Sequence, residues 1–118
     1  MNDLEVAVKE FINLVSQLKF REAHQYYSED IVNVENEGEP VVGLAAKREK
    51  ENELFEYFTD ISAEPLQFIV SDDMSVIEWR YRFKAKQTPD MIDYVQLSVQ
   101  RWKNGKIVHE RHHYKTSK

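Results

Sequence analysis

The sequence contains no cysteine, and this absence excludes disulfide bonds, thiol nucleophiles and thiolate metal sites. Glycine and proline are scarce, with three of each in 118 residues, and they form no linker-like segment. No stretch approaches the roughly 20 apolar residues of a membrane helix, and the start MNDLEVAVKEF lacks the basic and apolar runs of a signal peptide. We therefore expect a cytoplasmic protein that makes no membrane contact.

Positive charge is also in short supply. The chain has 16 Lys and Arg against 21 Asp and Glu, which gives a net charge of −5 and a pI near 5.4. A field of this sign repels nucleic acid, so we expect no nucleic-acid partner. The 42% apolar and 31% charged residues are ordinary for a globular protein, and the length predicts one domain over residues 1–118.

The first half of the chain has helical periodicity. Apolar residues three and four apart predict a helix over residues 4–18 and a shorter one over 19–27. A short strand over 31–36 and a loop over 37–43 follow, and a third helix is expected over 44–58. Within that helix, the run AAKREKENE (45–53) indicates a solvated face.

The second half changes to the alternating pattern of strands. Strands are predicted over 65–70, 75–86, 93–103 and 106–115, with an Asn-Gly hairpin at 104–105. The order of helix, helix, strand, helix and four strands predicts an α+β domain in which a strongly curved antiparallel sheet wraps around the helices.

Alternation also separates the two faces of this sheet. One face carries Trp79, Tyr81, Phe83, Tyr94, Gln96 and Ser98. The other carries Glu78, Arg80, Arg82, Val95, Leu97 and Val99. The first face suits the helices and a pocket, and the apolar row in the second predicts a homodimer through the convex side of the sheet.

Three of the four histidines lie in KNGKIVHERHHYK, residues 103–115. Counting from the hairpin places Val108, Glu110, His112 and Tyr114 on one face, and Ile107, His109, Arg111 and His113 on the other. His109 and His113 are about 13 Å apart along a strand at ~3.3 Å per residue, too far to share an ion. We expect no metal and no cofactor, and we interpret His109 and His113 as solvent or interface residues.

Longer stretches carry a family resemblance: FINLVSQLKFREAHQYYSEDIVNVEN (11–36), VVGLAAKREKENELF (41–55), EWRYRF (78–83) and LSVQRWKNGKIVHERHHY (97–114). In this order they resemble the nuclear transport factor 2-like superfamily, in particular its SnoaL-like members. The resemblance implies a cone-shaped, cystatin-like sheet with three helices on its concave side and often a dimer through the convex side. It does not imply one reaction, because members include steroid isomerases, polyketide cyclases, epoxide hydrolases and binding modules.

The resemblance also implies site residues. Glu35 matches the catalytic base of the steroid isomerases, whereas Phe11 and Ser98 stand where those enzymes carry their oxyanion donors. The absence of these donors argues against steroid isomerisation. Arg80 stands near the arginine of the epoxide hydrolases, but Arg82 replaces the carboxylate that should follow. Arg80 therefore faces either the pocket or, with Glu78, Arg82 and Arg111, a convex face of cross-strand ion pairs.

His112 matches a pocket position of the epoxide hydrolases, and an imidazole beside Glu110 can move protons near neutral pH. Alternatively, it is a structural histidine bonded to Glu110 or Gln96. The same choice between pocket and core applies to His24, Tyr26, Tyr27 and Trp102, for which we favour the core.

The sequence thus predicts one pocket with Glu35 and His112 as catalytic candidates. Its expected walls are Phe11, Trp79, Tyr81, Tyr94, Gln96, Ser98, Glu110 and Tyr114. Two functions remain open for a small hydrophobic or aromatic-sized ligand. One is cofactor-free proton transfer of the isomerase or cyclase type, and the other is a non-catalytic ligand-binding or dimerisation module.

Overall fold

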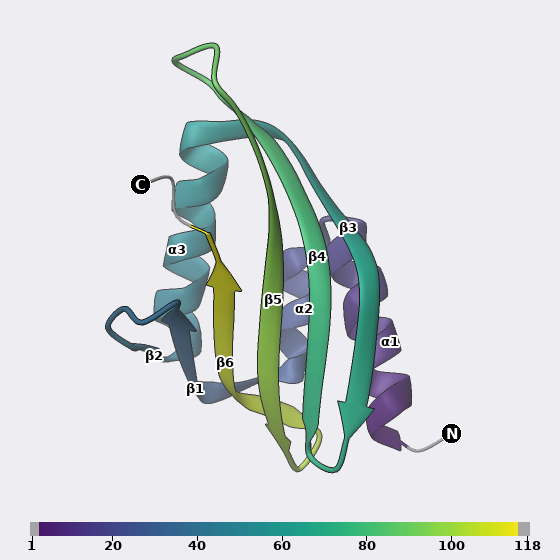
Figure 1. Ribbon diagram of the computed structural model, residues 1–118. Coiled ribbons are helices and arrows are strands. Elements are labelled where there is room, and N and C mark those ends of the chain that lie inside the picture. Colours follow the sequence, from purple (N-terminus) through teal and green to yellow (C-terminus); the bar gives the residue numbers. More distant parts are fainter. Residues whose placement is uncertain (1–2, 116–118) are drawn as a thin grey trace.

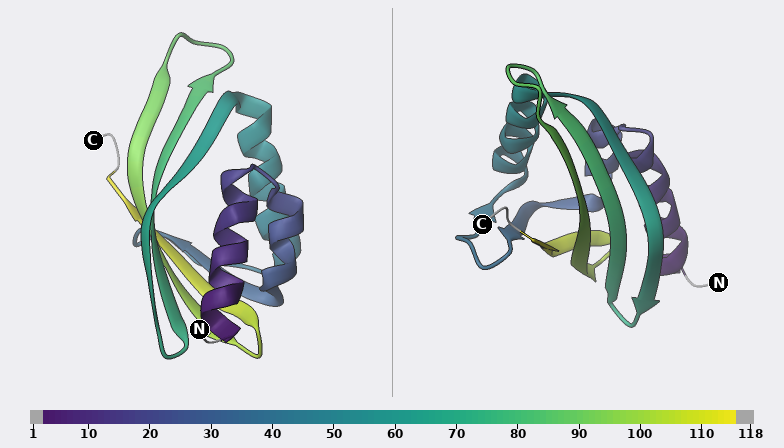
Figure 2. Two further views of the ribbon diagram at one scale, coloured as in Figure 1. Left: turned by 90° about the vertical axis from the view of Figure 1, so that its right-hand side faces the viewer. Right: turned by 45° about the horizontal axis from the view of Figure 1, so that its top comes forward.

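The computed structural model describes residues 3–115 and places its α-helices on one side of a curved six-stranded sheet (Figures 1 and 2). The helices are α1 (Asp3–Ser16), α2 (Phe20–Ala23), the 3-10 helix η1 (His24–Tyr26) and α3 (Leu44–Tyr57). The strands are β1 (Tyr27–Glu35), β2 (Val41–Val42), β3 (Phe58–Ser71), β4 (Met74–Ala85), β5 (Met91–Lys103) and β6 (Lys106–Tyr114). The α+β fold expected from the sequence is confirmed. No helix within residues 3–115 is long and apolar enough to cross a membrane.

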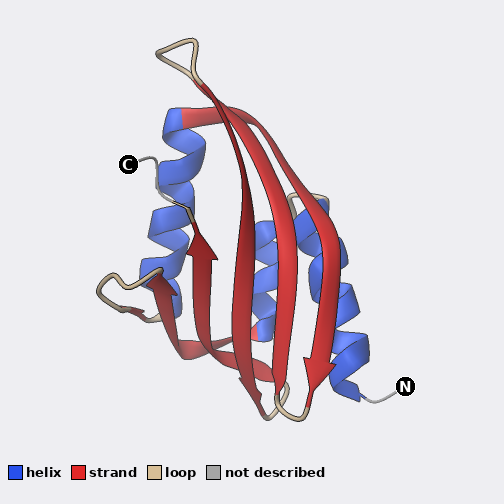
Figure 3. Cartoon of the chain, viewed as in Figure 1, coloured by secondary structure: helices blue, strands red, loops and turns tan. Residues whose placement is uncertain are grey.

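The sheet has the order β2-β1-β6-β5-β4-β3 (Figure 3). Its neighbours are antiparallel, as expected, except for β1 and β6, which pair in parallel. This exception arises because the chain passes through α3 and three long strands before β6 returns beside β1. The return brings Glu35 directly opposite His112 in the register.

Three strands begin earlier than the sequence pattern predicted: β1 at Tyr27, β3 at Phe58 and β5 at Met91. β3 begins at Phe58, directly after α3, whereas the pattern predicted a start at residue 65. Its first half pairs with β4 across a register shift between Thr59 and Ser62, so tertiary pairing extends a segment of weak strand propensity. The loop predicted over 37–43 contains the two-residue strand β2, which pairs with β1.

A bulge corrects the predicted faces of β6. Arg101 pairs with His109, but Trp102 pairs with Ile107, so Val108 is an extra residue in the strand. The extra residue shifts the alternation, and Ile107 is fully buried in the core, whereas the sequence pattern placed it on the outer face. From Glu110 to Tyr114 the predicted faces hold.

The core lies between α1 and the concave face of the sheet. Val8, Phe11, Ile12 and Val15 form the buried stripe of α1. They belong to one apolar cluster with Ile77 of β4, and Phe11 makes an edge-to-face contact with Tyr27 at 5.7 Å between ring centroids. His24 and Trp102 are buried and Tyr26 packs against the core, in agreement with the core interpretation, whereas Tyr27 is buried and also lines the cavity described below.

Helix α3 is anchored differently. Among its residues, Leu44 and Lys47 are buried, and most others are exposed. The solvated face predicted for the run 45–53 is therefore wrong at Lys47, whose side chain is only 10% exposed. The burial is stabilised by a carboxylate, Glu110, on the strand beneath.

Candidate functional site

A cavity of about 520 Å³ opens between the concave face of the sheet and the helices. Its walls are mostly aromatic and come from α1, β1, β4 and β5: Phe11, Tyr27, Trp79, Tyr81, Phe83 and Tyr94. Small-molecule pockets are commonly of this size and combine apolar walls with a few polar groups.

All but two of the site residues predicted from the sequence line this cavity. Ser98 does not, because it is 1% exposed and lies beneath His112 on the neighbouring strand. Tyr114 lies at the rim, against a second hollow, and its hydroxyl donates a hydrogen bond to Glu35 at 3.0 Å. Both are therefore supports of the two catalytic candidates rather than walls of the cavity.

His112 is fixed at one ring nitrogen by β5. Its Nδ1 lies 3.1 Å from Nε2 of Gln96, which donates to it, and 2.8 Å from Oγ of Ser98. Because an amide N–H donates to Nδ1, the proton of the neutral ring lies on Nε2. The side chain is 13% exposed, so His112 presents an N–H to the cavity from a nearly buried position.

The Nε2 atom of His112 lies between two carboxylates. Oε1 of Glu110 is 3.2 Å away and Oε2 of Glu35 is 3.9 Å away. The two carboxylates have contrasting surroundings, because the Glu110 side chain is 1% exposed and that of Glu35 is 50% exposed. The imidazole of His112 thus connects a buried carboxylate with one that is open to solvent.

Glu110 is held by several donors inside the core. The Tyr27 hydroxyl lies 2.9 and 3.0 Å from its two oxygens, and Nε2 of Gln100 donates at 2.5 Å. Burial by itself raises the pKa of Glu110. The charge of Lys47, together with His112 and the hydrogen bonds, outweighs burial, so the pKa lies well below the ordinary 4.5. Glu110 is therefore a permanent anion, not a proton carrier.

Lys47 is the site residue that the sequence analysis missed. Its Nζ lies 3.3 Å from Glu110, 3.5 Å from Asn33 and 4.6 Å from the centre of the Tyr27 ring, and it lines the cavity. A signal was present in the sequence, because Lys47 falls three residues after Leu44 on the same helical stripe as Leu54. That stripe faces the sheet, so the charged side chain at this position points toward the sheet.

Glu35 occupies the entrance. Its Oε1 accepts from Tyr114, and its Oε2 accepts from Nδ2 of Asn33 at 3.4 Å. Half of the Glu35 side chain is exposed to solvent. It can therefore exchange protons with bulk water while facing His112.

The tyrosines of the cavity remain protonated. Burial, followed by the neighbouring Tyr114 and Glu35, raises the pKa of Tyr94 to about 12. Burial raises the pKa of Tyr81 still further. Both rings thus act as neutral aromatic walls with a hydroxyl donor.

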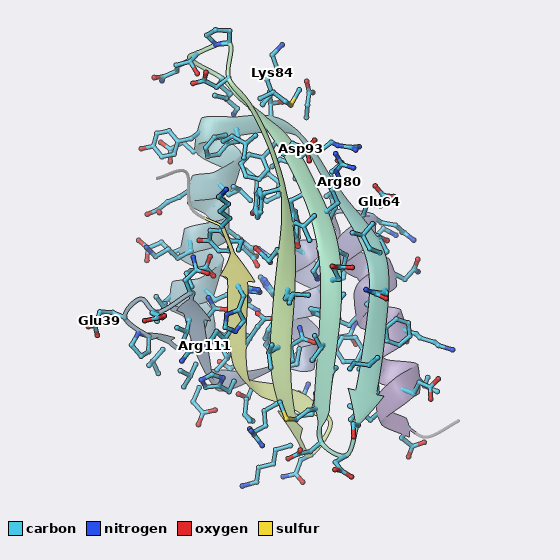
Figure 4. The ribbon with its side chains drawn as sticks, in the orientation of Figure 1. Glu39, Glu64, Arg80, Lys84, Asp93 and Arg111 are labelled. Carbon is cyan, nitrogen blue, oxygen red and sulfur yellow. The ribbon has the colours of Figure 1, made fainter. Side chains whose placement is uncertain are left out.

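Arg80 lies outside this site. Its guanidinium donates two hydrogen bonds to Asp93 at 3.0 Å, and Figure 4 shows Glu64, Arg80 and Asp93 together on the face of the sheet away from the helices. Arg80 and Arg82 thus form ion pairs on the convex face, but with Asp93 rather than within the predicted set. Glu78 instead accepts a hydrogen bond from Gln67, and Arg111 donates one to the carbonyl of Asn36. Within residues 3–115, no group of three or more His, Cys, Asp or Glu side chains has a metal-binding arrangement.

Comparison with known proteins identifies the family. The SnoaL-like domain model matches residues 8–110. An NTF2-like protein of unknown function from Burkholderia pseudomallei has a TM-score of 0.84 at 16% identity, with 98% of this chain and 92% of that chain covered. A candidate SnoaL-like polyketide cyclase from Mesorhizobium loti has a TM-score of 0.79 at 28% identity, with 97% and 100% covered.

A protein with a ketosteroid isomerase-like fold from Catenulispora acidiphila, in complex with trimethylamine, has a TM-score of 0.80 at 13% identity, with 94% of this chain and 86% of that chain covered. No curated protein matches the sequence. The family model covers most of the chain, and the fold agrees with it. The chain belongs to the SnoaL-like domain family, and it shares the fold of the NTF2-like protein described above.

Proposed function

We propose that the cavity binds a small apolar or aromatic-sized carbonyl compound and moves a proton on it without a cofactor. The observation that carries this proposal is the pair formed by Glu35 and His112, 3.9 Å apart at the wall of an aromatic cavity. The structural likeness to a candidate polyketide cyclase supports a reaction of this class.

The geometry gives the two residues different roles. Glu35 is the base, because its carboxylate is open to the cavity and accepts hydrogen bonds from the neutral groups of Asn33 and Tyr114. It removes a proton from the carbon next to the carbonyl, the C–H electron pair forms the C=C bond, and the carbonyl π electrons move to oxygen. His112 is the donor, since Nε2 carries the ring proton.

His112 takes the place of one of the oxyanion donors that the sequence lacks. Phe11 is apolar and Ser98 is turned to Nδ1 of His112, so neither can bind an oxyanion in the cavity. A positioned acid or base contributes roughly 10²–10⁴-fold to a proton transfer. We therefore expect a modest enolising activity rather than the rate of a specialised isomerase.

The test is deuterium exchange at the acidic carbon of 2-tetralone in D₂O, followed by NMR. We expect the protein to accelerate exchange and Glu35→Gln to lower the rate at least tenfold, on the order of the loss of one general base. Glu37→Gln is the matched control, because Glu37 is an exposed carboxylate two residues away. His112→Ala should lower the rate as well.

Absence of accelerated exchange, with saturable binding of 2-tetralone retained, would refute the proton-transfer proposal and favour the binding module. An equal loss of exchange rate in Glu35→Gln and Glu37→Gln would show that the negative charge around the entrance, and not a base at Glu35, accelerates the exchange.

We also propose that the convex face forms a homodimer. Val95 and Leu97 are 47% and 40% exposed, and Ile69 two strands away is 67% exposed. The same face carries both signs of charge, Glu64 and Asp93 beside Arg80 and Arg82, so a twofold axis can pair unlike charges.

A further inference from the structure

Lys47 is a buried cation at the cavity wall for which the proton transfer described above has no use. An ammonium that is 10% exposed has given up most of its hydration, and such groups are normally held by tight ion pairs.

The contacts of Lys47 are long. Its hydrogen bonds to Glu110 and Asn33 measure 3.3 and 3.5 Å, beyond the usual 2.7–3.2 Å of N–H···O bonds, and Glu51 lies at 3.9 Å. The hydrogen bonds to Glu110 and Asn33 use two of its three N–H groups. Lys47 is thus loosely held.

Glu110, by contrast, does not depend on Lys47 for its hydrogen bonds. Its short bonds come from the neutral groups of Tyr27 and Gln100, at 2.5–3.0 Å. If the ammonium turned toward a ligand, the carboxylate would keep these bonds and the nearby charge. The chain can therefore spare Lys47 for a ligand without exposing an unpaired acceptor.

Lys47 also lies next to the proton-transfer pair. Its Nζ and Nε2 of His112 are both within 3.3 Å of one atom, Oε1 of Glu110. In a carbonyl compound the oxygen and the acidic carbon are only two bonds apart. A ligand whose carbon faces Glu35 can therefore place its oxygen at the end of the cavity that Lys47 and His112 share.

We propose that Lys47 is a catalytic residue whose ammonium binds the ligand oxygen on which negative charge develops. When Glu35 removes the carbon-bound proton, the electron pair shifts through the new C=C bond to that oxygen, and Lys47 donates a hydrogen bond to it while keeping its own proton. Lys47 and His112 thus act together in place of the missing oxyanion donors. This inference deepens the proposed function, since it assigns the oxygen-binding group of the same site.

A purely structural Lys47 would neutralise Glu110 and leave the ligand's charge state unaffected. The ionisation of a bound phenol distinguishes the structural role from the catalytic one. A phenol carries an oxygen that can become negatively charged, and it undergoes no reaction in the cavity. 4-Nitrophenol is a suitable probe, because its phenolate has its own absorption band. The fraction ionised in the bound state is measured as a function of pH.

We expect the wild type to shift the bound probe toward phenolate, and Lys47→Met to lower the bound phenolate-to-phenol ratio on the order of tenfold or more, the effect of losing a charged donor. Lys9→Met is the matched control, because Lys9 is an exposed lysine that does not line the cavity and its loss changes the net charge equally. The control should behave as wild type.

If Lys47→Met does not fold, Lys47→Met/Glu110→Gln removes both charges of the pair and should fold with the phenolate preference lost. An unchanged ratio in either variant, an equal loss in Lys9→Met, or no saturable phenolate binding by the wild type would overturn the proposal. The probe requires no proton transfer from carbon, so a positive result here with no exchange of 2-tetralone would refute only the reaction.

Discussion

Replacing Lys47 by methionine should destabilise the fold much more than replacing an exposed lysine. The substitution keeps the length of the side chain but leaves the carboxylate of Glu110, 1% exposed, without the ammonium 3.3 Å away. Removing one partner of a buried ion pair typically costs about 3–5 kcal/mol. The short bonds from Tyr27 and Gln100 remain, so we expect about 3 kcal/mol, at the lower end of that range.

Urea unfolding followed by circular dichroism measures this change. Lys9→Met is the control for an exposed pair, since Lys9 meets Glu5 at 3.6 Å with nearly half of its side chain exposed, and we expect a loss of about 0.5 kcal/mol or less. Lys47→Met/Glu110→Gln should recover a large part of the loss, because no buried charge is left unpaired. A loss below about 1 kcal/mol in Lys47→Met would refute this interpretation of the buried pair.

Further predictions follow from burial and charge. Since the pKa of Glu110 is lowered in the folded state, the unfolded chain binds more protons than the folded chain below about pH 4.5. The free energy of unfolding should therefore fall as the pH drops through that region, and it should fall less steeply in Glu110→Gln. Urea titrations at each pH measure this dependence. Ile77→Ala should lose roughly 2–5 kcal/mol in the same assay because Ile77 is fully buried, and a loss under about 1 kcal/mol would contradict the core assignment. Leu97→Asp should convert the proposed dimer to the 14.1 kDa monomer, whereas Val42→Asp, at the far edge of the sheet, should remain dimeric. Light scattering measures the mass of each variant, and a monomeric wild type would refute the dimer. Burial raises the pKa of Tyr26, Tyr94 and Tyr114 to about 12. At about pH 11 the tyrosinate absorbance of the folded protein should therefore be a small fraction of that of the protein unfolded in urea. Equal absorbance of the folded and unfolded protein would contradict this.

The pattern of the sequence predicted the fold well because alternation and helical spacing report burial directly. Trp79, Tyr81, Gln96 and His112 were assigned to the cavity face by period two alone, and they line the cavity. The family resemblance brought Glu35 to the same opening, which the parallel pairing of β1 with β6 places opposite His112.

What the sequence pattern could not supply were features set by tertiary pairing. Lys47 looks like one lysine in a solvated run, and its burial follows only when Glu110 lies beneath it. The bulge at Val108 depends on how β5 and β6 align beyond their hairpin, so Ile107 was assigned to the wrong face. The direction of Ser98, toward Nδ1 of His112 rather than into the cavity, depends on the same register.

The tautomer of His112 tests the assignment of donor and base most directly. The account requires the neutral ring to carry its proton on Nε2, because Gln96 donates to Nδ1, which leaves Glu35 as the base. Nitrogen-15 NMR of labelled histidine distinguishes the tautomers, and the resonance is assigned by its loss in His112→Ala. We expect a protonated Nε2 and a bare Nδ1 above the pH at which the ring titrates. A neutral ring protonated at Nδ1 would contradict the account, because His112 would then offer a lone pair to the cavity and be the base itself.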